Sequence, residues 1–116
     1  MGNEKRQENN FGASDPVLSE MVGRLVEAFH PDQIYLFGSQ ARGEGGVNSD
    51  YDLMVIVSHS DLPGYRRDQM AYRVLLGLGV AKDVLVWTRE EFDRRLHLPA
   101  SLPATIAREG KLLYAA

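Results

Sequence analysis

The residues best suited to chemistry lie around two apolar runs in the first half of the chain. Gly38 and Ser39 follow the first run, and Asp50 and Asp52 open the second. Both runs are rich in β-branched and aromatic residues, which predicts two strands. Side chains two apart on a strand point to the same face, so the two carboxylates would lie side by side. Two acids against an apolar sheet need a neutralising cation, which predicts a site for Mg²⁺ and phosphate.

The turn between the two runs suits a phosphate ligand. Gly38 has no side chain, so a triphosphate could approach its backbone closely. If a short helical turn begins here, the N–H groups from Gly38 to Gln40 would point at phosphate oxygens. Ser39 adds a hydroxyl donor, and Arg42 could grip a terminal phosphate with its forked set of donors. Together these groups predict nucleotide binding.

The same residues resemble the signature of the minimal nucleotidyltransferases of the DNA polymerase beta superfamily. That signature is a Gly-Ser turn, an Arg a few residues later, and an Asp-x-Asp pair opening the next strand. The matching positions are Gly38, Ser39, Ala41, Arg42, Gly43, Ser49, Asp50, Asp52 and Leu53. The family also carries a third carboxylate on a later strand, for which this chain offers Asp83. The resemblance covers nearly everything after residue 14.

The resemblance implies a role for each residue. Asp50 and Asp52 would hold Mg²⁺, and a second ion would lie between this pair and Asp83. Asp83 could instead act directly as the general base, and the sequence leaves these two roles open. The remaining nucleotide-binding residues would be Gly38, Ser39, Arg42 and Ser49. The reaction implied moves a nucleoside monophosphate, most commonly AMP from ATP, to an acceptor hydroxyl.

The acceptor is not visible in the sequence. In the family, stand-alone domains of this kind are commonly paired with a separate HEPN-domain protein in toxin–antitoxin systems, which implies an antitoxin that adenylylates its toxin. A second hypothesis is a non-catalytic module that neutralises its partner by nucleotide-dependent or direct binding. A third is transfer to a small molecule such as an aminoglycoside. A site built from a single lobe would be completed by residues of a partner or of a second copy of the chain.

Composition narrows the class of protein. The chain has 116 residues, a mass of 13.0 kDa and no cysteine, which predicts one domain over residues 14–116 without disulfides. Residues 1–13 are polar and aperiodic, and predict a mobile tail. A net charge of −3 argues against nucleic acid as a partner. The absence of a signal-peptide core or long apolar run predicts a cytoplasmic protein that does not cross a membrane.

The elements that must position these residues follow from periodicity and capping. Ser14 or Asp15 would cap a first helix ending before Pro31, and Ser39 to Arg42 would form a helical turn. The predicted strands and later helices are: strand 33–37, strand 50–57, helix 65–78, a strand around Asp83, a short helix from Thr88 to about Leu96, a helix from Ser101 to Glu109, and strand 111–114. We expect an α/β fold with a small mixed sheet and helices mainly on one face.

Two further expectations concern side chains outside this motif. Tyr72 and Trp87 are predicted to lie in the core. The runs Tyr65-Arg66-Arg67 and Arg94-Arg95 are predicted to lie on solvated helix faces, where either could contact an acidic partner.

Overall fold

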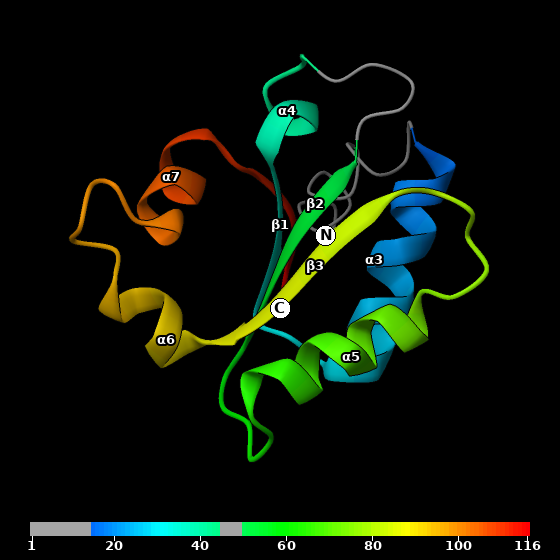
Figure 1. The fold of residues 1–116 in the computed structure, drawn as a ribbon, viewed down its shortest axis with the longest axis horizontal. Helices are drawn as coiled ribbons and strands as arrows, with labels where there is room; N and C mark the ends of the chain where they lie inside the picture. The colour runs from blue at the N-terminus through cyan, green and yellow to red at the C-terminus, as the bar shows by residue number, and fades with distance from the viewer. Residues whose placement is uncertain (1–14, 45–49) are drawn as a thin grey trace, which may run out of the picture.

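The computed structural model describes residues 15–44 and 50–116 (Figure 1). Its elements, labelled as in Figure 1, are α3 (Pro16–Phe29), β1 (Gln33–Phe37), α4 (Gly38–Ala41), β2 (Tyr51–Val57), α5 (Gly64–Val74), β3 (Lys82–Thr88), α6 (Arg89–Arg94), α7 (Leu102–Glu109) and β4 (Lys111–Ala115). The predicted tail at residues 1–13 and the candidate site residue Ser49 lie outside the described residues. No helix among the described residues has the length and apolar character needed to cross a membrane.

The four strands form one mixed sheet in the order β3-β2-β1-β4. Strand β1 runs antiparallel to both β2 and β4, whereas β2 and β3 are parallel. The carboxyl end of β1 therefore meets the amino ends of β2 and β3 at the same end of the sheet. β3 is an edge strand. This topology confirms the predicted small mixed sheet and supplies the strand order that periodicity could not.

Helices cover both faces of the sheet (Figure 1). The two longest, α3 and α5, pack on one face against buried side chains such as Leu53 and Val55. The shorter α6 and α7 pack on the other face against Met54 and Ile56. Alternate residues of β2 thus enter opposite cores, so this strand is buried on both sides except at its first residues. Helices were expected mainly on one face. The two longest do share one face, and the shorter α6 and α7 cover the other.

Side-chain caps fix where the helices begin. Asp15 is the N-cap of α3, because its Oδ1 accepts from the Leu18 N–H at 3.1 Å. Thr88 starts α6 with a capping box, in which its hydroxyl accepts from the Glu91 N–H while the Glu91 carboxylate accepts from the Thr88 N–H. The predicted starts of these two helices are confirmed.

Helix α5 ends earlier than predicted. It stops at Val74, and the following turn leads through Gly77 and Gly79, both at positive φ. These two glycines allow the chain to reverse direction and enter β3. Side chains of α5 reach the free edge of β3.

The prediction that Arg67 lies on a solvated face is wrong. Its side chain is almost fully buried and joins three elements. Its guanidinium forms a bidentate pair with Glu91 at 2.9 and 3.1 Å, and its Nε donates to the Val86 carbonyl at 3.1 Å. The Arg67 N–H donates to the Pro63 carbonyl, which places Arg67 in the first turn of α5, and the bond to Val86 shows that its side chain faces β3. Arg67 therefore ties α5 to β3 and to the start of α6.

We predict that Arg67→Ala lowers the free energy of unfolding by about 3 kcal/mol, because it leaves the Glu91 carboxylate and the Val86 carbonyl without their hydrogen-bond donor. The neighbouring Arg66→Ala, at an exposed position, should change it by less than about 0.5 kcal/mol. Urea denaturation of the two variants measures the difference. Equal losses would contradict the assigned role of Arg67.

Candidate active site

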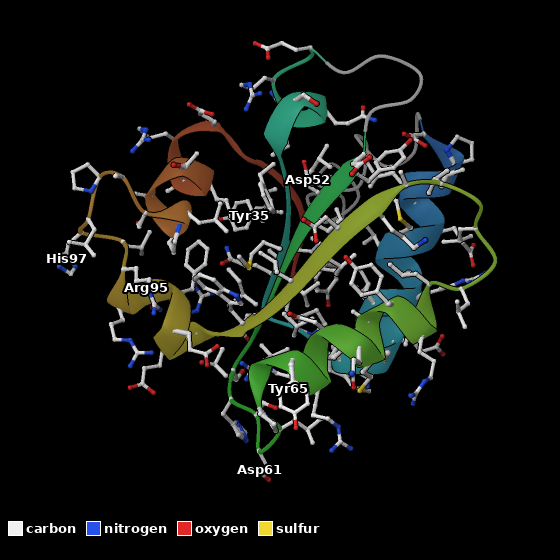
Figure 2. The ribbon with its side chains drawn as sticks, in the orientation of Figure 1. Tyr35, Asp52, Asp61, Tyr65, Arg95 and His97 are labelled. Atoms are coloured by element: carbon white, nitrogen blue, oxygen red, sulfur yellow. The ribbon has the colours of Figure 1, made fainter. Side chains whose placement is uncertain are left out.

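The three candidate acids meet at the end of the sheet where β1 stops and β2 and β3 begin. Asp52 pairs with Phe37 of β1 and with Asp83 of β3, so the two carboxylates occupy neighbouring positions on adjacent strands. Asp52 has the parity of Met54 and Ile56 and therefore faces the α6–α7 side of the sheet. Figure 2 shows Asp52 near α4, at the end of the molecule opposite Asp61. The topology thus brings together residues 31 positions apart in the sequence.

The electrostatics of Asp52 reflect this crowding. Burial raises the pKa of the Asp52 carboxyl above its ordinary value of 3.8, and the negative charges of Asp83 and Asp50 raise it further. Arg42 acts in the opposite direction and lowers it. The folded chain therefore holds Asp52 in a place that disfavours its charged form, although Asp52 is only half-buried. A bound cation would remove that penalty.

Gly38 lies directly against the Asp52 carboxylate. Its φ is +79°, a conformation that favours glycine, and a Cβ at this position would collide with Oδ2 of Asp52. The position therefore requires glycine twice over: for its backbone conformation and for the space that the carboxylate occupies. The Gly-Ser turn and the acid pair, which are separate features of the sequence, form one compact unit in the structure.

The helical turn predicted after Gly38 is present as α4. It begins at Gly38 and Ser39, and Phe37 at its N-cap provides no side-chain cap. Its first N–H groups are thus not capped by a side chain, which suits them to an outside acceptor. Ser39 lies in the first turn and is half-buried.

Arg42 sits at the C-cap of α4 and is exposed. Its Nε donates to Glu44 at 3.1 Å, and its NH1 lies 3.7 Å from the Glu109 carboxylate of α7. Exposed ion pairs of this kind contribute little to stability. Arg42 can therefore exchange these partners for a phosphate at small cost, while its charge already acts on Asp52.

Asp83 has a partner that the sequence did not reveal. The hydroxyl of Tyr72 on α5 donates to Asp83 Oδ1 at 3.0 Å and accepts from the Val84 N–H at 3.1 Å. The prediction that Tyr72 lies in the core is wrong, because 37% of the residue is exposed. Its ring projects along the free edge of β3 instead. No spacing in the sequence marks this contact, which depends on β3 being an edge strand.

The rest of that edge is covered in the same way. The Val86 N–H donates to Asp68 Oδ1 at 2.9 Å, and the Val86 carbonyl accepts from Arg67. Side chains of α5 thus satisfy outward-facing backbone groups of β3 that another strand would otherwise pair with. An exposed acid such as Asp83 is tolerated at this edge because water reaches it and Tyr72 orients it.

The donor set fits a magnesium ion, with one restriction. Among the described residues no group of three His, Cys, Asp or Glu side chains is arranged to hold a metal ion. Mg²⁺, however, is usually bound by one or two carboxylates together with substrate phosphates and water. The repulsion that raises the Asp52 pKa is the condition that such an ion relieves. The residues present therefore fit an ion completed by the nucleotide; the two-ion site stays a prediction.

The comparison with protein families agrees with this geometry. A model of the nucleotidyltransferase domain family matches residues 18–113, which include all three acids and the Gly38 turn. The chain therefore belongs to the nucleotidyltransferase domain family, and it is a nucleotidyltransferase.

Individual proteins that resemble this chain have low sequence identity to it. A protein from Methanocaldococcus jannaschii, provisionally named a protein adenylyltransferase, is 26% identical over 102 residues, which cover 86% of this chain and 97% of that protein. A provisionally identified nucleotidyltransferase from Sulfolobus solfataricus has a TM-score of 0.56 at 27% identity, over 68% of this chain and 70% of that chain. A toxin–antitoxin structure with AMP-PNP has a TM-score of 0.57 at 25% identity, over 84% and 73%. A further toxin–antitoxin structure, 20% identical, shares the fold.

The contact between Gly38 and Asp52 generates a stability prediction. Gly38→Ala should destabilise the protein by about 2–4 kcal/mol, through the positive φ and the collision with the carboxylate. Gly43→Ala is the matched control, because Gly43 also has a positive φ, of +76°, but open space where its Cβ would be. The control should cost only about 1–2 kcal/mol. Equal losses in thermal or urea unfolding would show that the Asp52 contact is unimportant.

The raised pKa of Asp52 predicts a dependence of stability on pH. The folded state favours the protonated acid, so ionising Asp52 costs stability at neutral pH. In metal-free buffer, Asp52→Asn should be more stable than the unchanged protein at pH 7. The difference should shrink as the pH falls through the raised pKa and disappear below the ordinary value of 3.8.

The exposed Asp61→Asn is the control for this experiment and should show no such gain. Urea unfolding across the pH range measures both variants. An Asp52→Asn protein that is less stable at neutral pH, by an amount independent of pH, would contradict the assigned electrostatics.

Proposed function

We propose that this chain transfers AMP from ATP, with Mg²⁺, to a hydroxyl of a partner protein, and that it serves as the antitoxin to a HEPN-type toxin. The observation that best supports this reaction is the position of Asp52, which lies against the Gly38 backbone and beside Asp83. This arrangement puts the phosphate-binding turn and the carboxylates within one ligand's reach. Nucleotidyl transfer needs little more from a protein than positioning and charge neutralisation.

The residues of the turn would bind the triphosphate. Gly38 leaves its backbone open to the phosphates, and the N–H groups at the start of α4 donate to their oxygens. Ser39 adds its hydroxyl to the same oxygens. Arg42 exchanges its exposed carboxylate partners for the terminal phosphates and stabilises the negative charge on the departing pyrophosphate.

The carboxylates would hold the metal and orient the acceptor. Asp50 and Asp52 are the ligands of the Mg²⁺ ion, with Asp83 as a ligand of a second ion or as the base. Magnesium, when bound, neutralises the phosphate oxygens and lowers the pKa of an attacking hydroxyl. Asp83 lies at the exposed edge of the sheet, so an acceptor from outside the chain can approach it directly. Tyr72 fixes the carboxylate in place.

The similar proteins support a protein acceptor. The Methanocaldococcus jannaschii relative carries the name of a protein adenylyltransferase and matches along almost its whole length. The toxin–antitoxin structure with AMP-PNP pairs a fold like this one with both a partner and an ATP analogue. In this proposal the open side of the site receives a surface loop or helix of the toxin, whose modified hydroxyl is then unavailable for its own function.

The decisive experiment follows the α-phosphate of ATP. We predict that the chain, incubated with α-labelled ATP, Mg²⁺ and the proteins that co-purify with it from its native cells, transfers label to one protein band. Asp50→Asn and Asp52→Asn should abolish the band, because either removes a metal ligand. Asp93→Asn, an exposed acid on α6, is the control and should leave the label unchanged.

Two other outcomes are informative. A partner that co-purifies but carries no label with any nucleotide or metal would contradict catalysis and leave a binding module. Label appearing only in small molecules would contradict a protein acceptor while preserving the transferase chemistry.

A further inference from the structure

The outer face of α5 carries an exposed apolar stripe. The stripe consists of Tyr65, Tyr72 and Leu76, which are 64%, 37% and 69% exposed. Their spacing of seven and four residues places them on one side of the helix and its last turn. Figure 2 shows Tyr65 beside the beginning of α5, at the end of the view away from Asp52. The stripe therefore extends along the helix from that end toward the candidate site.

The opposite side of α5 packs against the core and the edge of β3. Ala71 and Leu75 are fully buried in the core, and Arg67 and Asp68 bind the backbone of β3. Packing thus explains the inward side chains. In the stripe, the Tyr72 hydroxyl bonds Asp83 and the Val84 N–H, while Tyr65 and Leu76 are largely exposed. Large apolar residues gathered on one exposed face usually mark an interaction surface.

Two unpaired positive charges flank this stripe. Within residues 15–44 and 50–116, the arginines whose guanidinium groups have no hydrogen bond, ion pair or ring contact are Arg66, Arg73 and Arg94. Arg66 and Arg73 are seven residues apart and border the stripe on one side. The one acid of α5, Asp68, is turned inward to the Val86 N–H. The outer face of α5 is therefore positive, although the chain as a whole is negative, with a net charge of −3.

The stripe is also continuous with the candidate active site. The Tyr72 ring belongs to the stripe, and its hydroxyl donates to Asp83 at 3.0 Å. A protein lying along α5 would consequently reach the exposed edge of β3 at Asp83. Among the large exposed hydrophobic residues of the described part of the chain, Tyr72 is the one with a hydrogen bond to a candidate catalytic acid.

We propose that the outer face of α5 is the docking surface for the acceptor protein, and that this acceptor presents acidic side chains beside apolar ones. Tyr65 and Leu76 would enter apolar contacts, while Arg66 and Arg73 would pair with the acids and set the register. Docked in this register, the acceptor brings its hydroxyl to Asp83. This inference rests on the proposed function, because it takes Asp83 to be part of the active site that the docked protein reaches.

Site-specific photocross-linking tests the surface even while the partner is unidentified. The photoreactive residue p-benzoylphenylalanine is introduced at position 65 or 76, and for comparison at Leu98, an exposed apolar residue between α6 and α7. After irradiation in the native cells, we expect one protein to be cross-linked from positions 65 and 76 and not from position 98. Cross-linking from position 98 alone, or from none of the three, would overturn the proposal.

Charge reversal tests the chemistry of that partner. With the cross-linked protein purified, the double variant Arg66→Glu/Arg73→Glu should weaken its binding by roughly tenfold or more. Arg94→Glu reverses the third unpaired arginine, on α6, and should bind normally. Equal affinities for the two variants would overturn the assignment of an acidic partner to α5.

The label from α-labelled ATP separates this inference from the proposed function. Label transfer that survives the α5 double variant would preserve the transferase and overturn the docking surface. Cross-links from positions 65 and 76 without any label would preserve the surface and overturn protein modification. The Asp52→Asn variant should cross-link like the unchanged protein, because Asp52 lies outside the stripe.

Discussion

The contact between the Gly38 backbone and the Asp52 carboxylate is the constraint on which the site depends. It exists because β1 and β2 are antiparallel neighbours, with Phe37 opposite Asp52, so the turn that follows β1 must pass over the first acid of the strand. Only glycine can occupy that crossing. Burial raises the pKa of Asp52, and the charges of Asp83, its neighbour on β3, and of Asp50 raise it further. The chain thus gives up stability for a carboxylate cluster that favours a cation. The turn proposed to bind phosphate and the acids proposed to bind metal are therefore parts of one packing arrangement.

Much of this arrangement could be predicted from local signals. The Gly-Ser turn, Arg42, Asp50 and Asp52 stand close together in the sequence, and the caps at Asp15, Thr88 and Ser101 mark three helix starts that the structure confirms. Asp52 shares its face of the sheet with Met54 and Ile56, as the period of two along a strand implies. Asp83 was predictable as a member of the group through the family resemblance, since nothing in its own surroundings gives its distance from Asp52.

What could not be predicted depends on strand order. Periodicity does not reveal that β3 is an edge strand, and the roles of Tyr72, Asp68 and Arg67 all follow from that fact. A tyrosine and an arginine on a helix were assigned by residue type to the core and to the solvent, and both assignments were wrong. At an edge strand the usual preference reverses, because a buried guanidinium and a phenol hydroxyl satisfy backbone groups that an aliphatic side chain would leave unpaired. Helix α5 thus both covers the free edge of β3 and orients Asp83.

We propose that the fold tolerates a crowded Asp52 because a magnesium–nucleotide complex neutralises it. The most direct measurement is the melting temperature at neutral pH as Mg²⁺ and a non-hydrolysable ATP analogue are added, for the unchanged protein and for Asp52→Asn. A ligand that binds the folded state raises the melting temperature as its concentration increases. We predict such a rise for the unchanged protein and its loss in the Asp52→Asn variant. An equal rise in both proteins, or none in either, would contradict it.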